Sequence, residues 1–361
     1  MAIQSYATAG TVARVGIIKG RILKHAMPVI SLGTVGINDD FKKNTGDTVK
    51  YRRFLPKGAS SAQPNRFFLD STTVDRSQAY ANGFATSEGV TPVAETISAQ
   101  DITATVIQHS ILAGYTDKTF DLHEDDIPKA MTKYVGETKG LVNESVLFGV
   151  LKGCTNKFYG GTGTSRATVN GTISLTGLRK IARSMCLNHA TTISRMLRRG
   201  PAGTYGTAPV GKSFPVWVST DLIPDLRELP NFIPVEEYGD PSIAVDNECG
   251  KCEEFRFIAS PELVDVQDSG AAVAGSVPAL KSLTGTYADV YQVIIGSEDA
   301  WGHIGISSDK MEVSALPPGL KDKNDPLGQR GYVGCKWYYH AVILNNLQMA
   351  VYEVATRALT D

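Results

Sequence analysis

The feature that most constrains this chain is a long helical pattern between Glu124 and Gly153. Carboxylates at Asp125 and Asp126 precede Pro128, an arrangement that caps and starts a helix. At 1.5 Å per residue the helix would span roughly 40 Å, more than one compact core needs, so the pattern predicts a strut packed on neighbouring elements. The apolar residues recur at steps of three and four, along one side: Ile127, Met131, Tyr134, Val135, Leu141, Val142, Val146, Leu147, Val150 and Leu151.

Three glycines lie inside this pattern and could interrupt the predicted helix. Gly136, Gly140 and Gly149 each weaken a helix by up to about 1 kcal/mol relative to alanine. A kink at Gly136 or Gly140 is the alternative to one continuous helix, and contacts with neighbours would have to keep it straight.

Charge is unevenly distributed along the chain. The net charge is −1, but residues 1–58 hold ten Lys or Arg against three Asp, about +7, which leaves about −8 for the remainder. A basic segment joined to an acidic body predicts binding to an acidic neighbour, to another copy of the chain or to nucleic acid. A solvated positive surface is the alternative.

Length and composition narrow the class of protein. The 361 residues are 42% apolar, enough for two or three structural units or one elaborated domain. Five cysteines, an odd number, indicate reduced thiols rather than a disulfide framework. Because no apolar run approaches 18 residues and no signal-type core opens the chain, we expect a soluble protein made inside a cell, without membrane contact.

The first hundred residues contain little that could form a core. Residues 1–45 lack a sustained period and predict an extended arm, with a short helix near Ala26, that cannot bury itself. Thr48–Leu55 alternates as a strand does. Residues 56–100 have no helical period, and loops of about 45 residues are usually functional or disordered. Thr103–Tyr115 predicts a long strand that leads into the strut.

The second half mixes helices and strands. Leu175–Leu197 has helical spacing and predicts a second helix. Tyr332–Leu344 and Leu347–Thr356 flank Asn345–Asn346, which predicts a closing β-hairpin. Shorter elements are expected at 214–219 (strand), 221–229 (helix), and 255–259, 287–296 and 301–306 (strands). The order predicts an α+β fold in which residues 155 to about 310 are inserted into a domain closed by both ends of the chain.

One motif matches a nucleotide-binding pattern. Gly206–Ser213 fits the phosphate-binding loop, which works when it follows a strand and opens a helix. Here Phe214–Val216 predicts a strand directly after the motif. A surface loop is therefore preferred to a nucleotide-hydrolysing site.

Other candidate sites are equally weak. Cys249 and Cys252 could form half a zinc site or a redox pair, but no second pair completes the site, and a β-turn with incidental thiols is preferred. The carboxylates of 124–126 cap a helix in this interpretation rather than acting as acid and base. The six histidines have no partner spacing: His25, His109, His123, His189, His303 and His340. We therefore predict no catalytic, cofactor-binding or metal-binding residue, and no enzyme.

Taken in order, several blocks of the chain resemble the major capsid proteins of tailed phages. The blocks are Phe214–Ser219, Asp221–Arg227, Gly250–Pro261, Val290–Gly296 and Ala300–Gly302. Further blocks are similar to the N-four-like podovirus capsid family: Gly46–Arg53, Asp325–Gly331, Gly334–Tyr339 and Ala341–Asn345. The order of the blocks, over about residues 45 to 356, carries the resemblance. The pair Cys249 and Cys252 lies outside the family pattern.

The resemblance implies the Hong Kong 97 capsid fold. On that mapping residues 1–45 are the N-terminal arm and 46–100 the protruding E-loop. Residues 101–153 and 310–361 form the P-domain, including a spine helix at 124–153, and 154–309 form the A-domain.

It also implies a function. The chain would self-assemble into hexamers and pentamers of an icosahedral phage head that encloses double-stranded DNA without reading its sequence. Its place would be the virion capsid, assembled in the bacterial host cytoplasm, with portal, scaffolding and decoration proteins as further partners. The alternatives are an encapsulin-like compartment shell, a phosphate-loop NTPase, and a tail or decoration protein.

An intersubunit contact follows as a hypothesis. Arg52, Arg53 and Lys57 in the E-loop would meet acidic groups of the strut on an adjacent copy, such as Glu124, Asp125 and Asp126. Exposed ion pairs contribute under about 1 kcal/mol each, but repetition over a shell would make assembly sensitive to salt.

Overall fold

A computed structural model describes residues 29–41, 46–56, 59, 61, 63–65, 84–92, 94, 96–122, 126–199, 205–238, 244–276, 278–306, 312–321, 323 and 325–359. Its helices are α2 (Asp117–Leu122), α3 (Ile127–Leu151), α4 (Leu175–Leu187) and α5 (Ile223–Arg227). Short 3-10 turns are η1 (Leu32–Thr34), η2 (Arg166–Thr168), η3 (Thr220–Leu222) and η4 (Val235–Glu237). The mixture of helices and strands confirms the predicted α+β class.

The strands form two sheets and a separate pair. They are β1 (Ile37–Phe41), β2 (Thr48–Phe54), β3 (Ala99–Thr105), β4 (Ile107–Thr116), β5 (Lys157–Tyr159), β6 (Ile193–Arg199), β7 (Tyr205–Ser219), β8 (Phe232–Pro234), β9 (Glu248–Cys252), β10 (Phe255–Ser260), β11 (Tyr291–Ile295), β12 (Trp301–Ile306), β13 (Glu312–Leu316), β14 (Arg330–Ile343) and β15 (Ala350–Val354). The five-stranded sheet has the order β1-β12-β14-β13, and β4 pairs with β14. The eight-stranded sheet has the order β5-β15-β11-β7-β10-β9-β8, and β6 pairs with β7.

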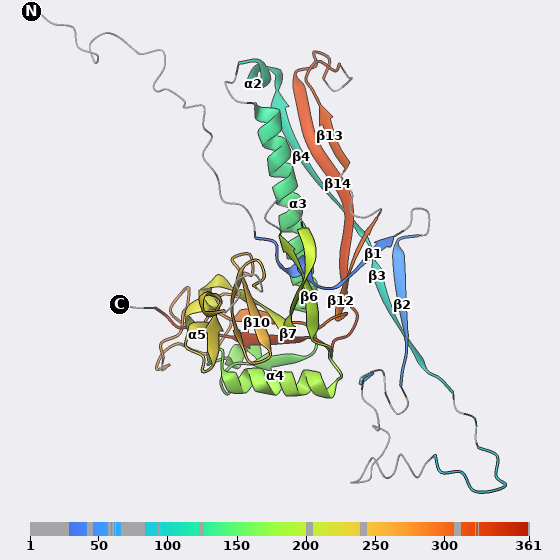
Figure 1. Cartoon of the computed structure of the whole chain (residues 1–361). Coiled ribbons are helices and arrows are strands. Elements are labelled where there is room, and N and C mark those ends of the chain that lie inside the picture. The colour runs from blue at the N-terminus through green and yellow to red at the C-terminus, as the bar shows by residue number, and fades with distance from the viewer. Residues whose placement is uncertain are drawn as a thin grey trace, which may run out of the picture.

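The long helix α3 lies along the five-stranded sheet (Figure 1). Val135 of α3 is fully buried against Tyr115 and Val333, from β4 and β14. The indole Nε1 of Trp337 donates to Asn143 Oδ1 at 2.8 Å and ties helix to strand. With these contacts α3 is one continuous helix despite the glycines inside it. It is shorter than the predicted span of 124–153.

The eight-stranded sheet is covered on both faces. Val216 and Val218 of β7 belong to a core with helices α4 and α5, whereas Trp217 between them points into a core with the end of α3. This alternation is the period of two that a strand imposes. Since the second core also contains Trp301 of β12, the end of α3 links the two sheets.

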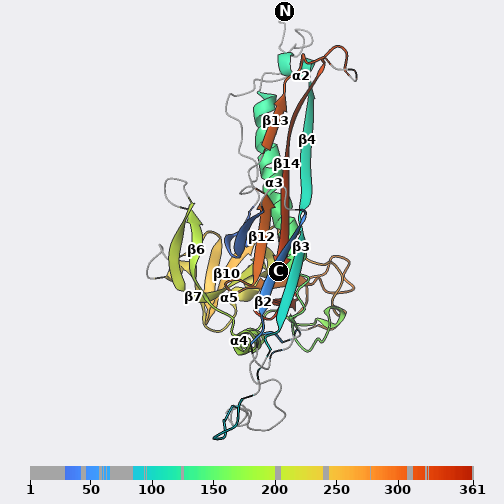
Figure 2. The ribbon, with the colours of Figure 1, turned by 90° about the vertical axis from the view of Figure 1, so that its right-hand side faces the viewer.

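The third unit is an antiparallel ribbon of β2 and β3, paired from Thr48↔Thr105 to Phe54↔Ala99. Partly buried Tyr51 packs with Ala104 against the five-stranded sheet. Beyond these contacts the ribbon extends away from the body, on the opposite side from the start of α3 (Figures 1 and 2).

The prediction that residues 1–45 cannot bury themselves is wrong for residues 29–41. Leu32 is completely buried and Val35 nearly so. Strand β1 pairs in parallel with β12, from Ile37↔Gly302 to Phe41↔Ile306. The rest of the predicted arm, with the helix expected near Ala26, lies outside the described residues.

The predicted second helix is too long. It ends at Leu187, because Asn188 closes the last turn and His189 has a positive φ of 55°. The next residues gain backbone hydrogen bonds as β6, paired with β7. Ile193 and Met196 are both buried in this strand, because a register shift between Ile193 and Arg195 interrupts the alternation of its side chains.

The predicted closing hairpin is also wrong. Strands β14 and β15 belong to different sheets, and β15 lies between β5 and β11. Every residue of β15 is buried, which suits the middle of a covered sheet rather than a hairpin edge. The turn around Asn345 instead crosses between the sheets, where its backbone N–H donates to Ala300 O at 3.0 Å.

Two strands therefore lie outside the domain that the sequence predicted for them. Strand β12, expected in the A-domain, joins the sheet beside α3, and β15, expected in the P-domain, joins the other sheet. Apart from these two strands, the division into four regions stays a prediction.

Candidate intersubunit surfaces

The outer half of the ribbon carries two of the predicted contact residues. The guanidinium of Arg52 makes two hydrogen bonds with the facing Asp101, Nε to Oδ1 at 2.7 Å and Nη2 to Oδ2 at 2.9 Å. These bonds hold the pKa of Asp101 below its ordinary value. Arg53 donates to Gln100 Oε1 from Nε at 3.0 Å and from Nη2 at 2.7 Å. Both arginines are therefore positioned by the opposite strand.

The predicted acidic partners are only partly described. Asp126 is the N-cap of α3, and its Oδ1 accepts from the Lys129 backbone N–H at 3.2 Å, which confirms the capping interpretation for this one residue. Lys57, Glu124 and Asp125 lie outside the described residues. Within one chain the ribbon and the start of α3 lie far apart (Figure 1). Contact between Arg52 or Arg53 and Asp126 of another copy stays a prediction.

Large apolar side chains are exposed near the outer end of the ribbon. Phe54, the last residue of β2, is 69% exposed, and Ile97, just before β3, is 79% exposed. The two lie near each other, because Leu55 N donates to Ser98 O at 2.9 Å. An isolated two-stranded ribbon is marginally stable in water. This end of the ribbon therefore has the composition of a surface that another protein covers.

A second exposed apolar group lies at the opposite end of the molecule, on α2 and near β13 and β14. Its members are Phe120, Leu122, Leu316, Leu320 and Leu327, each about half exposed or more. The elongated chain thus has an apolar group at each end (Figure 1).

A buried carboxylate of α3 holds the described part of the N-terminal region. Glu144 is 3% exposed, and its Oε1 accepts from the backbone N–H of Ser31 at 3.0 Å and of Leu32 at 2.9 Å. These are amides at the start of η1, where a carboxylate is favoured. We call this arrangement the Glu144 clamp. It was not predicted, but an acid between the apolar residues Val142 and Val146 of α3 was a signal for it.

Aromatic side chains complete the attachment of this segment. Trp217 Nε1 donates to Ser31 O at 3.2 Å, and Trp301 Nε1 donates to Val35 O at 3.1 Å. A nitrogen of His303 lies 3.0 Å from the same oxygen, and burial lowers the pKa of this histidine. Gly36 has a φ of 111°, and a Cβ there would lie 2.7 Å from Trp301 Nε1. The backbone therefore passes the indole in a way that favours glycine.

Burial gives the Glu144 clamp a dependence on pH. Loss of solvation, with a smaller contribution from the charge of Glu262, raises the Glu144 pKa above the ordinary value of 4.5. The folded chain then binds a proton more tightly than the unfolded chain. The stabilisation is fully present below the unfolded pKa and is lost as pH rises through the folded pKa.

We expect the excess stability of the unmodified chain over Glu144→Gln to fall as pH rises above 4.5, the ordinary glutamate pKa. Glutamine keeps the acceptor oxygen but does not titrate. Urea unfolding of both chains at a series of pH values measures the difference, in which titrating groups that do not interact with Glu144 cancel. A difference that stays flat or grows with pH would contradict the assignment.

The phosphate-binding pattern has the wrong surroundings for its chemistry. Gly206–Ser213 lies within β7 and pairs with β6, so both the surface-loop prediction and the NTPase alternative fail on its geometry. Strand β7 continues to Ser219, so no helix opens at the motif to direct its N-terminal amides at a phosphate. An extended strand does not form the cradle that this motif requires.

The two cysteines of interest lie on strand β9 rather than in a turn. Cys249 Sγ is 3.3 Å from Phe257 O, and Cys252 Sγ is 3.5 Å from Pro230 O. Both are free thiols, and burial raises the pKa of each. Across the described ranges, no group of three His, Cys, Asp or Glu is placed to hold a metal ion. In the same ranges no helix is long and apolar enough to cross a bilayer.

A curated protein resembles part of this chain in sequence. No family model matches the chain. A curated "Major capsid protein" of Pseudomonas phage KPP21 is 24% identical over 267 residues, covering 67% of this chain and 64% of that protein. The match thus spans less than two thirds of the relative's length.

Solved structures resemble nearly the whole chain. The capsid of Ralstonia phage GP4 has a TM-score of 0.60 at 11% identity, over 98% of this chain and 100% of the other. The Cyanophage Pam1 capsid has a TM-score of 0.59 at 14% identity, with the same coverage. At these identities the likeness shows the fold. The chain therefore has the capsid fold of tailed phages, the Hong Kong 97 fold, as its sequence resemblance had predicted.

Proposed function

We propose that this chain is the major capsid protein of a tailed phage, which assembles into the hexamers and pentamers of an icosahedral head around double-stranded DNA. The observation that carries the proposal is the capsid fold over almost the entire chain, together with the capsid protein of phage KPP21 as a relative in sequence. The exposed apolar groups at both ends of the molecule support it, because such groups need partners.

The finer parts of the proposal follow the same mapping. The ribbon belongs to the E-loop, α3 is the spine helix, and the eight-stranded sheet is the centre of the A-domain. The protein would occupy the virion capsid, assemble in the host cytoplasm and work with portal, scaffolding and decoration proteins. Membership of the N-four-like podovirus family stays a prediction.

Electron microscopy of the chain expressed alone, or with the phage's scaffolding protein, tests the proposal. We expect closed shells of uniform size. An encapsulin-like compartment shares the fold, and it is distinguished by the nucleic acid content of shells isolated from infected cells: a phage head contains DNA. Isolated rings or trimers without shells would favour a tail or decoration protein instead.

The charge contact gives a separate prediction. We expect Arg52→Glu with Arg53→Glu to lower shell yield several-fold, and added salt to lower the yield of the unmodified chain, because exposed ion pairs are screened. Asp101→Asn is the matched control, since it breaks the pair inside the ribbon but leaves both arginines. Equal yields for the reversed and unmodified chains, measured by sedimentation, would contradict the contact.

A further inference from the structure

A second basic region lies far from the N-terminus. Residues 145–220 contain no Asp or Glu, so their net charge is +10 in a chain whose total is −1. The ten cations are Lys152, Lys157, Arg166, Arg179, Lys180, Arg183, Arg195, Arg198, Arg199 and Lys212. A run of 76 residues without a carboxylate is unusual for a chain with 37 acidic residues. We therefore looked for what these cations bind.

Three of these cations have a structural role. Glu353, 1% exposed, pairs with Arg166 at 2.6 Å and with Lys157 at 3.8 Å. Arg179 on α4 pairs with Glu253 in the turn between β9 and β10. These pairs explain part of the charge, and they leave the remaining cations of α4 and of the hairpin unexplained.

Four of the remaining cations are exposed and lack such partners. Lys180 and Arg183 lie on α4, Arg195 on β6 and Lys212 on β7, and none forms an ion pair with a described residue. We call these four residues the basic face. Strand β6 also contains Arg198 and Arg199.

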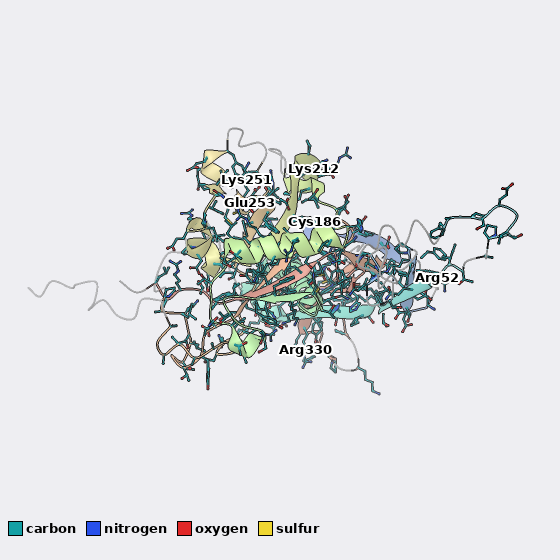
Figure 3. All side chains as sticks on the ribbon, turned by 90° about the horizontal axis from the view of Figure 1, so that it is seen from below. Arg52, Cys186, Lys212, Lys251, Glu253 and Arg330 are labelled. Carbon is teal, nitrogen blue, oxygen red and sulfur yellow. The ribbon has the colours of Figure 1, made fainter. Side chains whose placement is uncertain are left out.

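Chain connectivity places the elements that carry the basic face, α4, β6 and β7, next to one another. The side of α4 that carries Leu178, Ile181 and Met185 is buried on the sheet, so Lys180 and Arg183 are on the outer side. Helix α4 ends five residues before β6 begins, and Ile193 of β6 pairs with Ser213, the neighbour of Lys212. Figure 3 shows α4 across the face seen from below, with Cys186 at the helix and Lys212 beyond it toward the edge of the molecule, where Lys251 and Glu253 are also labelled. In Figure 2 the hairpin of β6 and β7 projects sideways from the body, and α4 lies below it.

We propose that the basic face binds the phosphate backbone of double-stranded DNA. The identity of the ligand rests on the proposed function, since a phage head would present this polyanion at high concentration. Helix α4 covers about 20 Å, and a duplex offers a phosphate charge about every 1.7 Å of its axis, so a row of cations meets several phosphates without a pocket. Contacts of this kind do not depend on base sequence.

The distribution of apolar surface favours DNA over a protein partner. Lysine is depleted in the cores of protein interfaces, and such surfaces centre on apolar side chains. The described part of α4 has one large exposed apolar side chain, Leu187 at 53% exposure, whereas apolar side chains gather at the ribbon, around Phe54 and Ile97, and near α2, around Leu122. Surfaces for neighbouring copies and a surface for a polyanion are thus separate.

The experiment compares DNA binding by the purified chain and by the triple variant Lys180→Gln, Arg183→Gln and Lys212→Gln. Fluorescence anisotropy with a labelled duplex of about 30 base pairs, at about 50 to 200 mM salt, gives the slope of log affinity against log salt. We expect the magnitude of the slope to fall by about 2 to 3, and affinity at about 0.1 M salt to fall about tenfold or more. Two duplexes of unrelated sequence should bind equally.

The matched control removes the same charge elsewhere: Lys118→Gln, Lys129→Gln and Lys133→Gln, on α2 and α3. It should leave the slope unchanged, and urea unfolding checks that both variants fold. If the triple variant of the basic face keeps the slope of log affinity against log salt, the proposal is overturned. If that variant forms no shells but binds DNA as the unmodified chain does, the basic face contacts a protein partner instead. If the unmodified chain forms no shells but the slope still falls in the first variant, the proposed function fails and the basic face stands.

Discussion

We expect the double variant Phe54→Asp with Ile97→Asp to form no shells, while the isolated chain stays folded. Burial of one large apolar side chain contributes about 1.5 to 3 kcal/mol. Two such side chains at each contact therefore contribute about 3 to 6 kcal/mol, or a factor of one hundred or more in the association constant. Because both residues are largely exposed in the single chain, the free energy of unfolding should change by less than about 1 kcal/mol.

The conservative double variant Phe54→Leu with Ile97→Leu is the control. It keeps apolar area at the end of the ribbon and should keep most of the shell yield. Light scattering during assembly and urea unfolding of the unassembled chain give the two readouts. If the aspartate variant assembled as well as the unmodified chain, the ribbon end would not be a subunit contact.

Alanine at position 144 should destabilise the chain by about 3 kcal/mol. The substitution leaves the buried N–H groups of Ser31 and Leu32 without their acceptor, at about 1 to 3 kcal/mol for each unsatisfied group. Part of this cost disappears if residues 29–36 detach and become hydrated. We therefore expect faster hydrogen exchange at Ser31 and Leu32 along with a lower free energy of unfolding.

Glutamine at the same position separates the acceptor from the charge. Glu144→Gln keeps an oxygen for the two amides and removes a buried charge, so its stability should stay within about 1 kcal/mol of the unmodified chain. Hydrogen exchange followed by mass spectrometry, with urea unfolding, measures both variants. If alanine and glutamine had the same small effect, the Glu144 clamp would not hold the segment.

The sequence pattern correctly predicted those helices and strands that are determined by residues close together in the sequence. The stripe of α3, its cap at Asp126 and the strand Trp301–Ile306 depend on residues near one another in sequence. The packing of the strut on neighbouring elements also followed, since a helix this long with glycines inside it needs contacts that keep it continuous. The end of α4 was missed because helical spacing continues through Ile193 and Met196, whereas a positive φ at His189 ends the helix.

Sheet membership could not be predicted in the same way. Asn345–Asn346 is favourable for a hairpin turn, but β15 gains two strand neighbours and complete burial by entering the other sheet. Residues 29–41 looked like a segment without a core because their partners Glu144, Trp217 and Trp301 are more than a hundred residues away. Of the predicted contact residues, Arg52 and Arg53 are positioned by Asp101 and Gln100, which only the strand register reveals.

The central claim is that copies of this chain cover one another's exposed surfaces in a closed shell. A cryo-electron microscopy reconstruction of assembled particles tests it most directly. We predict an icosahedral shell in which the ribbon end around Phe54 and Ile97 rests on a neighbouring copy. Particles in which this end faces solvent, or a chain that stays monomeric at high concentration, would contradict the claim.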